Sequence, residues 1–378
     1  MVMTYDHIVI GVGGMGSATV NELAKRGRKV LGLEQFDIPH DQGSSHGLTR
    51  IFRFAYNSHP NYVPLMQRAY EMWLELEEGF GEKLQYVTGG LDISARDGRV
   101  FNGALASSRQ HGLVHEILDA AAINARFPGM VVPDDFAAVF QPDAGFLMSE
   151  RCVVASAMSA IKAGADIRAR ERMISWEPNG AGVTVTTNRG TYKAGSLIIT
   201  AGAWAGKLLP SLAATAVPER QVLGWFLPFE PALYEPARFP VFVLDAEEGH
   251  YYGFPLHGVP GFKIGRFRHR LENTDPDNVR RTIDDQDEAV LRSAVSRYFP
   301  KANGATMALK TCMFTNTPDE HFILDHHPEH PQVVVGAGFS GHGFKFCTVI
   351  GEILADLATA GATRHDIDMF AIDRFRLA

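Results

Sequence analysis

Residues 7–16, His-Ile-Val-Ile-Gly-Val-Gly-Gly-Met-Gly, are the stretch that decides the fold class of this chain. Its first four residues form a short apolar run typical of a buried strand, and a helical pattern follows the glycines as far as Leu23. A second apolar run, Lys29 to Leu33, ends at Glu34, which lies 18 residues after Gly16. A G-x-G-x-x-G sequence between a strand and a helix, followed at this distance by an acid, indicates a βαβ unit that binds a dinucleotide.

Each part of this motif has a physical task. Gly11 permits a tight turn, Gly13 lets the backbone approach a pyrophosphate, and Gly16 lets the helix pack closely on the strand. The start of the helix adds free N–H groups and a partial positive charge for the phosphates. Glu34 can accept both hydroxyls of a ribose, which suits FAD or NAD and disfavours a 2′-phosphate. The cofactor-binding residues predicted from this segment are Gly11, Gly13, Gly14, Met15, Gly16 and Glu34.

The composition excludes several classes of function. The 378 residues carry a net charge of −7 and contain no basic run, so nucleic acid and anionic membranes are poor partners. The start of the chain lacks the pattern of a signal peptide, and no stretch approaches the roughly 18 apolar residues of a membrane span. Three scattered cysteines are too few for a disulfide framework or a zinc site. We therefore expect a cytoplasmic protein without a metal, in which the His-rich run at 325–330 is a solvated loop.

Strands that end in glycine turns occur at 8–11, 197–202 and 333–338, far apart in the sequence but alike in type. A discontinuous nucleotide-binding domain that is interrupted by two insertions explains this spacing. The predicted fold is therefore α/β, with a Rossmann-like nucleotide-binding domain and a substrate domain built on a mixed or antiparallel sheet. The first domain is assigned residues 1–85, 150–217 and 310–378, and the substrate domain residues 86–149 and 218–309.

Local patterns predict further elements. Residues 61–78 carry apolar side chains at helical spacing, and residues 50–53 alternate as in a strand. Residues 218–275 are rich in aromatic residues and strand-like runs, and a polar helix is expected over about 277–298. The glycine-rich run at 339–343 is expected to open a helix that continues to about residue 358.

Five further segments resemble one known family of enzymes. They are Gly-Ser-Ser-His-Gly-Leu-Thr-Arg at 43–50, Tyr-Tyr-Gly-Phe-Pro at 251–255, Phe-Lys-Ile-Gly at 262–265, Thr-Cys-Met-Phe-Thr-Asn-Thr-Pro-Asp-Glu-His-Phe-Ile at 311–323 and Ala-Gly-Phe-Ser-Gly-His-Gly-Phe-Lys-Phe at 337–346. Their order and spacing, which cover essentially the whole chain, resemble the monomeric sarcosine oxidase and N-methyltryptophan oxidase family. Those proteins are covalent FAD amine oxidases of the D-amino-acid-oxidase-like fold group. The resemblance implies that the Rossmann-like domain is an FAD-binding domain.

The resemblance also implies that FAD is joined through its 8α-methyl group to the sulfur of Cys312. Without its neighbours, a free cysteine between Thr311 and Met313 would be interpreted as a small core side chain. The segment around it matches the family, which favours flavin attachment. Cys152 and Cys347 match no functional position and keep the core interpretation.

Charged residues of the site are assigned by the same resemblance. Arg53 and Lys345 align with residues that hold the substrate carboxylate, an anion that needs charge-assisted hydrogen bonds. Arg50 and Lys263 align with cations beside the flavin ring. Lys263 lies in an alternating strand and is expected to point into a cavity. The alternative interpretations are a surface ion pair for Arg53 and an exposed strand lysine for Lys263.

Two more residues, His342 and Tyr252, match positions close to the flavin ring. With Lys263 and Arg50 they form the predicted catalytic set. Contacts with the cofactor are also implied for Ser45, Thr49, Arg50, Gly338, Gly341, Gly343 and Lys345.

Two positions depart from the pattern of sarcosine oxidases. Those enzymes carry a His four residues after the strand lysine and a Tyr two residues after the attachment cysteine, whereas this chain has Phe267 and Phe314. Both changes remove polar groups from the expected substrate cavity, so we expect substrates that are bulkier or more apolar than sarcosine. Arg266, Arg268 and His269 lie nearby in the sequence and are expected to replace the lost groups in part.

The residues and the resemblance together predict an FAD-dependent oxidase of secondary, N-methyl or N-alkyl, amino acids. The expected products are an imine, which hydrolyses to an amine and an aldehyde, and H₂O₂. The expected partners are a small amino-acid substrate and O₂, and the protein is expected to be a monomer. Alternatives are an oxidase of Amadori (fructosyl) amino acids or cyclic imino acids, or a flavin amine dehydrogenase with another acceptor. A non-catalytic flavin-binding protein would not need the set Arg53, Lys263, Cys312 and Lys345, and an NAD enzyme would not explain Cys312.

Overall fold

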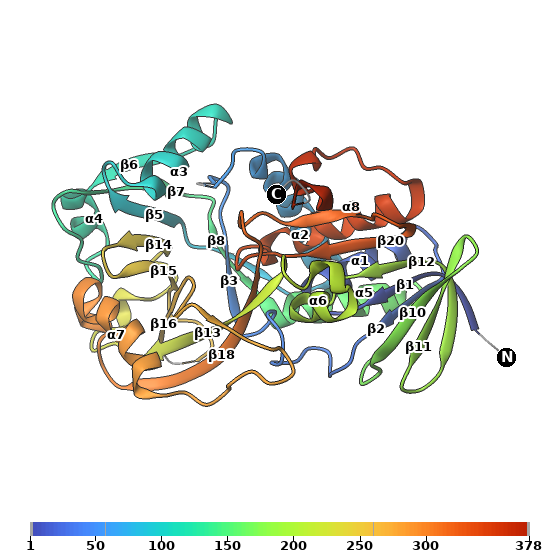
Figure 1. Ribbon diagram of the computed structural model, residues 1–378. Helices are drawn as coiled ribbons and strands as arrows, with labels where there is room; N and C mark the ends of the chain where they lie inside the picture. Colours follow the sequence, from blue (N-terminus) through green and yellow to red (C-terminus); the bar gives the residue numbers. More distant parts are fainter. Residues whose placement is uncertain (1–2, 57, 260, 376–378) are drawn as a thin grey trace.

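The computed structural model describes residues 3–56, 58–259 and 261–375, which form two lobes that meet along a junction (Figure 1). One lobe contains the strands of the N-terminal motif, and we call it the Rossmann-like lobe. The other contains a larger sheet, and we call it the mixed-sheet lobe. The chain crosses between them repeatedly, so neither lobe is one continuous piece of sequence.

The Rossmann-like lobe has a central parallel sheet in the order β9-β2-β1-β12-β20. These strands are Met3–Ile10 (β1), Val30–Leu33 (β2), Asp166–Arg168 (β9), Thr191–Ile199 (β12) and His330–Ala337 (β20). Runs of Val, Ile and Leu are typical of such strands because both faces of a parallel sheet are covered. The antiparallel strands Met173–Asn179 (β10), Gly182–Thr187 (β11) and Ile323–His327 (β19) extend the sheet.

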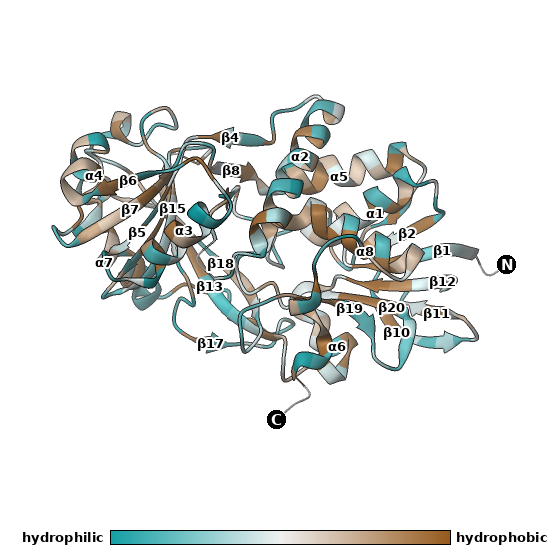
Figure 2. Ribbon diagram, turned by 90° about the horizontal axis from the view of Figure 1, so that it is seen from above, coloured by the Kyte–Doolittle hydropathy of each residue, from teal (hydrophilic) through white to brown (hydrophobic). Residues whose placement is uncertain are grey.

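Helices cover one face of this sheet, as the view from above in Figure 2 shows. They are Gly14–Lys25 (α1), Tyr62–Phe80 (α2), Ser149–Lys162 (α5) and Cys347–Ala360 (α8). Their apolar stripes share one core with strand residues such as Val9 and Val334. Helix α1 packs against both α5 and α8, which fixes its first turn beside the carboxyl end of β1.

The first turn of α1 approaches β1 more closely than most side chains would allow. Gly11 has a φ of +88°, a conformation that L side chains rarely adopt. A methyl group on Gly16 would overlap the carbonyl oxygen of Gly11. The structure thus explains why glycine is needed at both positions of the strand-to-helix turn.

The mixed-sheet lobe contains a sheet in the order β17-β13-β16-β15-β14-β5-β7-β6, with β18 paired to β13. The strands are Gly90–Ala95 (β5), Glu116–Asp119 (β6), Phe136–Gln141 (β7), Val217–Phe226 (β13), Val241–Ala246 (β14), Gly249–Phe254 (β15), Phe262–Arg266 (β16), Glu272–Asn273 (β17) and Thr306–Asn316 (β18). Residues 86–149 and 218–309 both contribute strands, and β14 joins the two groups by pairing in parallel with β5. The two predicted insertions therefore build one sheet, while the exact domain boundaries stay a prediction.

A small antiparallel sheet links the two lobes (Figure 1). It contains Thr49–Phe52 (β3), Gln85–Val87 (β4) and Gly145–Met148 (β8), with β8 between the other two. The extended segment predicted at 50–53 corresponds to β3, which carries Arg50 to the junction.

Helices cover both faces of the mixed sheet. Ala120–Arg126 (α4) and Asp285–Tyr298 (α7) pack on the face with Ala138, and Arg99–Gln110 (α3) packs on the opposite face with Ala137 and Val139. The expected helix at 277–298 begins only at Asp285, because Asp284 caps it in a reciprocal pair with Asp287. Leu291 and Val295 of α7 share a core with Ile264, so one face of β16 looks at this helix.

Two other local expectations are only partly correct. The helix expected after the run at 339–343 is α8, but it begins at Cys347, because Ser340 and Gly341 have positive φ and a 3₁₀ turn at Phe344–Phe346 comes first. The run at 325–330 is a β-hairpin between β19 and β20, and only its turn at Pro328 and Glu329 is exposed as expected of a solvated loop. Across the described ranges, no group of three or more His, Cys, Asp or Glu side chains is placed to hold a metal ion.

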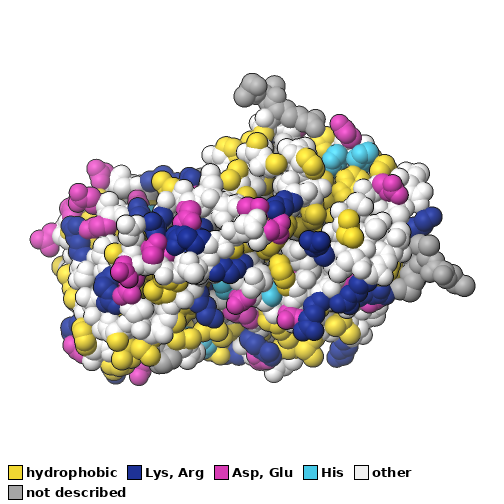
Figure 3. Space-filling model, turned by 60° about the horizontal axis from the view of Figure 1, so that its bottom comes forward, with side chains coloured by type: hydrophobic (Ala, Val, Ile, Leu, Met, Phe, Trp, Pro, Cys, Tyr) yellow, Lys and Arg dark blue, Asp and Glu magenta, His cyan; other side chains and the backbone are white. Residues whose placement is uncertain are grey.

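The architecture confirms the predicted fold class, an α/β Rossmann-like lobe with a mixed-sheet lobe. Figure 3 shows acidic and basic side chains interspersed over one face of the molecule. In the part of the chain that the structure describes, no helix has both the length and the apolar character needed to cross a membrane.

We expect Asp287→Asn to destabilise the mixed-sheet lobe strongly. Asp287 accepts two hydrogen bonds of 2.8 Å from the guanidinium of Arg220 on β13, and both side chains are fully buried. Removing one partner of a buried ion pair leaves an uncompensated charge and costs about 3–5 kcal/mol. Denaturant titration measures the free energy of unfolding, with Asp285→Asn, an exposed acid of the same helical turn, as the control. A loss no larger than that of the control would contradict this role of the pair.

Candidate active site

A cavity lies at the junction of the two lobes and is lined by residues of both. The Rossmann-like lobe contributes the glycine turn and Glu34. Arg53, Phe267, Cys312 and Lys345 come from separate parts of the sequence and line the same cavity. The predicted dinucleotide motif and the predicted substrate residues therefore share one space.

The glycine turn presents backbone N–H groups to this cavity. The N–H of Gly14 donates to Ser45 Oγ at 3.0 Å, and the Glu34 carboxylate accepts the N–H groups of Val12 (2.9 Å) and Phe36 (3.0 Å). The residues of this set that line the cavity are Gly11, Gly13, Gly14, Met15, Glu34 and Ser45. Gly16 does not line it, because it faces the carbonyl group of Gly11 within the turn.

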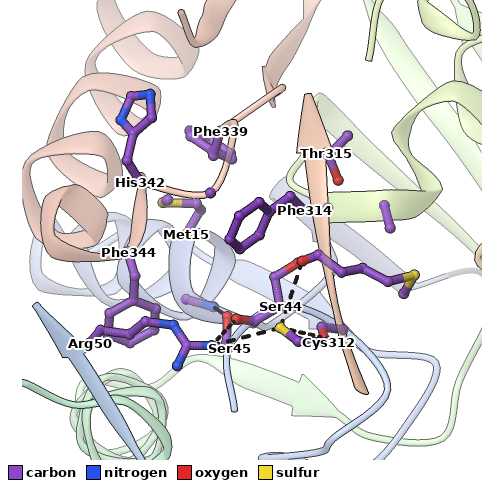
Figure 4. Close-up of a pocket in the computed structure, with 18 of the residues that line it drawn as sticks. Met15, Ser44, Ser45, Arg50, Cys312, Phe314, Thr315, Phe339, His342 and Phe344 are labelled. Atoms are coloured by element: carbon purple, nitrogen blue, oxygen red, sulfur yellow. Dashed lines mark hydrogen bonds between the residues drawn. The ribbon is translucent and has the colours of Figure 1, made fainter. Parts of the chain in front are cut away.

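Cys312 lies on β18 with its sulfur beside Arg50, and both line the cavity (Figure 4). The distance from the Arg50 Nη2 atom to Cys312 Sγ is 3.9 Å. Burial raises the pKa of the Cys312 thiol, whereas the Arg50 charge stabilises the thiolate. A guanidinium next to a thiol favours its reactive form. Cys152 and Cys347 are buried in the core of the Rossmann-like lobe, as expected, and Cys347 also lines the cavity.

Lys263 is buried, with 2% of its surface exposed, and faces away from α7 because Phe262 and Ile264 occupy that side of β16. Its ammonium donates to Gly47 O (2.7 Å), Thr49 O (2.8 Å) and Thr49 Oγ1 (2.9 Å). Burial lowers the pKa of Lys263 well below its usual value, while these oxygens favour the charged form. The exposed-lysine alternative is wrong, but so is the expected cavity-facing position. Neither Lys263 nor Thr49 lines the cavity, because the ammonium lies under the 47–49 segment.

Arg53 and Lys345, the predicted carboxylate-binding pair, both lie close to the ring of Tyr56. Arg53 Cζ is 5.4 Å and Lys345 Nζ is 5.0 Å from the ring centroid. Arg53 pairs with Asp92 at 2.7 Å, and Lys345 donates to the carbonyl oxygen of His342 at 3.1 Å. Burial lowers the pKa of Lys345 well below its usual value, and the Arg53 charge acts in the same direction. The alternative of a surface ion pair for Arg53 is wrong, because the ion pair is buried.

His342 is a neutral side chain in this arrangement. Its Nε2 donates to the carbonyl oxygen of Glu320 at 2.9 Å, and its Nδ1 accepts from the Tyr56 hydroxyl at 2.6 Å. Burial, followed by the Lys345 charge, lowers the pKa of His342 to about 3. With both nitrogens engaged, His342 lines the cavity as a fixed neutral ring and has no lone pair free to act as a base.

Tyr252 also lines the cavity, and its ring lies over β16. A methyl group on Gly265 would overlap that ring, so the glycine makes room for it. Burial raises the pKa of Tyr252, which keeps its hydroxyl protonated. The predicted ring-proximal residues thus reach the cavity from β15 and from the segment before α8.

Phe267 and Phe314 form an aromatic part of the wall, with ring centroids 5.6 Å apart. The expected replacement of lost polar groups is wrong for Arg266 and His269. Arg266 donates to the carbonyl oxygen of His269, whose ring is fully buried against Asp287 on the α7 side. Neither of them lines the cavity, whereas Arg268 does.

Sequence reasoning missed His250, which lines the cavity next to Phe267 with ring centroids 5.7 Å apart. His250 Nδ1 lies 3.3 Å from a carboxylate oxygen of Asp245 on the neighbouring strand. The only signal in the sequence is the alternation of β14 and β15, since cross-strand pairing decides which residues meet. Sequence reasoning also missed Asp92. An acid between Leu91 and Ile93 in an apolar strand was the feature of the sequence that could have indicated a functional residue there.

The glycines before α8 divide into two groups. Gly341 and Gly343 line the cavity, and a methyl group on Gly341 would overlap the ring of Phe314. Gly338 has a φ of +62° and packs against Thr317, so it shapes the turn without lining the cavity.

Residues 6–357 match the family described as FAD dependent oxidoreductase. The chain belongs to this family. It is 43% identical to the monomeric sarcosine oxidase of Streptomyces avermitilis, over 99% of this chain and 98% of that protein. It is 35% identical to the N-methyl-L-tryptophan oxidase of Yersinia pestis, over 99% of this chain and 100% of that protein. The open form of NikD, an unusual amino acid oxidase essential for nikkomycin biosynthesis, has a TM-score of 0.85 at 26% identity and covers 98% of this chain and 97% of its own.

FAD, the cofactor of the family, fits the cavity. A methyl group on Gly13 would occupy the space in front of Ser45, where the backbone must stay open for a pyrophosphate. Thr315 lines the same cavity, and within the described residues its buried hydroxyl has no hydrogen-bond partner. A polar group of the cofactor would satisfy it.

Proposed function

We propose that this FAD-dependent oxidoreductase is an oxidase of secondary amino acids that carry an N-methyl or N-alkyl group. The observation that carries the proposal is the buried pair Arg53 and Lys345 in the cavity that also contains the dinucleotide turn. Asp92 pairs with Arg53 and offsets one of these two buried positive charges, which favours binding of one further anion, and a carboxylate is the anion that amino acids supply. The names of the two enzyme relatives agree with a secondary amino acid as substrate.

In this proposal the chain's residues bind and orient the substrate. Arg53 and Lys345 hold the carboxylate, so the carbon next to nitrogen is fixed in one place. The aromatic wall with Phe267, Phe314 and Tyr252 excludes water around it. FAD, when bound, accepts two electrons and a proton from the amine and passes the reducing equivalents to O₂, which yields H₂O₂. Because His342 is neutral and both of its ring nitrogens are engaged, it does not accept a proton from the amine, and in this proposal the amine enters as the free base.

The oxidised substrate is an imine, which water converts to an amine and an aldehyde. O₂ as acceptor, the covalent link at Cys312, a monomeric state and a cytoplasmic location belong to the proposal. Its support is the resemblance of the segments around Cys312 and Lys263 and, for the link, the distance between Cys312 and Arg50.

The direct test is a panel of amines assayed for flavin reduction and for peroxide. It contains sarcosine, N-methyl amino acids with larger apolar side chains, a fructosyl amino acid and pipecolate. Since Phe267 and Phe314 make the wall apolar, a larger N-methyl amino acid should exceed sarcosine in kcat/KM by about 10-fold or more. Sarcosine as the best substrate would refute the inference from the phenylalanines. Failure of every amine to reduce the flavin would refute the proposed function, and reduction without peroxide would point to another acceptor.

Covalent attachment at Cys312 predicts that acid-precipitated wild-type protein stays yellow. Cys312→Ala should release FAD into the supernatant, whereas Cys152→Ala, a buried cysteine away from the cavity, should keep a yellow pellet. Mass spectrometry of the tryptic peptide with residue 312 should show the added mass of FAD. A colourless wild-type pellet would exclude the covalent link and leave FAD as a dissociable cofactor.

Lys263 is expected to speed the reaction of the reduced holoenzyme with O₂. The first electron transfer creates superoxide, and a preorganised cation in a water-poor site stabilises that negative charge. Lys263→Met should slow reoxidation about 10²–10³-fold and should slow reduction by the amine much less. Stopped-flow measurements separate the two half-reactions, with Lys193→Met on the exposed side of β12 as the control. A wild-type rate of reoxidation in Lys263→Met would assign oxygen activation to another group, with Arg50 next to be tested.

A further inference from the structure

Arg53 is held in a closed ring of contacts that involves Asp92 and Gln141. Arg53 Nη1 pairs with Asp92 Oδ1 at 2.7 Å, and Asp92 Oδ2 accepts from Gln141 Nε2 at 3.0 Å. Gln141 Oε1 accepts the backbone N–H groups of Phe54 (3.0 Å) and Ala55 (2.7 Å). Arg53 Nη1 closes the ring by donating to the carbonyl oxygen of Ala55 at 2.9 Å. The guanidinium is thereby fixed to two strands of the mixed-sheet lobe.

The sheet brings Asp92 to this place through the alternation of its strands. Leu91 and Ile93 of β5 belong to the core of the mixed-sheet lobe, so Asp92 between them faces the opposite side. Asp92 pairs across the sheet with Val243 of β14, which lines the cavity. A carboxylate that is 0% exposed is thus placed in the layer of side chains next to the substrate cavity.

A role in stability alone does not explain why an acid occupies position 92. A buried ion pair contributes little net stability, and apolar residues of similar size often serve as well. Here the acid also lies among cations that have a separate task. Burial raises the pKa of Asp92, while the charges of Arg53, His250 and Lys345 favour its carboxylate form. With Asp92 ionised, the two positive charges of Arg53 and Lys345 sum with it to one, which a single substrate carboxylate neutralises.

We propose that Asp92 is a positioning residue of the carboxylate site, which fixes Arg53 and maintains the charge of Lys345 so that the site accepts one carboxylate. This inference rests on the proposed function, because it assigns Asp92 to the same substrate carboxylate. Asp92 acts through the two cations and has no direct contact with the substrate in this role.

The charge of Lys345 depends on the groups that surround it. These are Arg53, Asp92, Tyr56 and His342. Burial and the Arg53 charge lower the pKa of Lys345, and Asp92 raises it. Tyr56 stays protonated because burial raises its pKa, and the pKa of His342 is about 3, so neither changes charge between pH 6 and 10. Carboxylate affinity is therefore lost as the pH rises through the pKa of Lys345, and removal of the Asp92 charge moves this loss to lower pH.

The experiment measures the affinity of the holoenzyme for (methylthio)acetate between pH 6 and 10 from the change in the flavin spectrum. In this probe a thioether replaces the secondary amine, so the ligand itself does not titrate in that range. Asp92→Asn should move the alkaline loss of affinity down by about one pH unit, which is about 10-fold weaker binding at a given alkaline pH. Asp245→Asn removes another acid that lines the cavity but pairs with His250, and it should keep the wild-type profile.

A merely structural role would lower affinity equally at every pH. An unmoved profile in Asp92→Asn, with the same pH of half-maximal affinity as wild type, overturns the inference. If Asp92→Asn does not fold, the exchange variant Asp92→Asn/Gln141→Glu keeps both the net charge and the amide–carboxylate hydrogen bond. It moves the negative charge away from Arg53, so its profile should still lie below that of wild type, and a wild-type profile again overturns the inference.

Arg53→Ala separates this inference from the proposed function. If Arg53→Ala binds (methylthio)acetate as well as wild type, the carboxylate site itself is wrong and the proposed function loses its main support. If Arg53→Ala loses affinity while Asp92→Asn keeps the wild-type profile, only the role of Asp92 is wrong.

Discussion

Lys263, Arg53 and Lys345 are buried where the two lobes meet, and water cannot solvate their charge there. Each of them therefore requires oxygen atoms from the protein. Lys263 of the mixed sheet takes them from the segment 47–49, and Arg53, just after β3, takes one from Asp92 of β5. Because the acceptors come from distant parts of the chain, satisfying these charges fixes how the lobes meet. The position of the cavity follows from that arrangement.

The same positive charges make the cavity suited to anions. Burial prevents water from screening them, so the field inside is stronger than the net charge of −7 for the whole chain would suggest. Arg50 adds a further positive charge near Lys263: it donates to the carbonyl oxygens of Ser44 and Thr49 and lies beside Cys312. A negative net charge for the whole chain and a positive cavity can occur in one protein, because the charge inside the cavity depends only on which side chains are buried there.

The sequence allowed the glycine turn, the α/β fold class and the burial of Lys263 to be predicted, because these depend on local spacing and strand alternation. Most of the predicted site residues that line the cavity came from the resemblance to a family. Four predicted site residues, Gly16, Thr49, Lys263 and Gly338, do not line it. Asp92 and His250 could not be found in this way. Each is recognisable only once β5, β14 and β15 are paired, since the register between strands decides which side chains share a layer.

Local errors had similar causes. The helix expected at 277 starts at Asp285 because the capping pair, rather than the polar pattern before it, determines where the first turn forms. The replacement expected from Arg266 and His269 failed because residues close in the sequence lie on opposite sides of the sheet. A histidine does line the cavity, but it is His250 of the neighbouring strand rather than His269.

The contact between Gly265 and the Tyr252 ring has a consequence for enzyme engineering. Any side chain at Gly265 would displace the Tyr252 ring, so Gly265 cannot be varied without changing the cavity wall that Tyr252 forms. The outer layer is different, because His250 and Phe267 touch each other across two strands and the ion-pair partner of His250 is Asp245 rather than a cation of the junction. Libraries that vary these two positions together can change the size and polarity of the pocket while the cations that hold the lobes in place stay untouched.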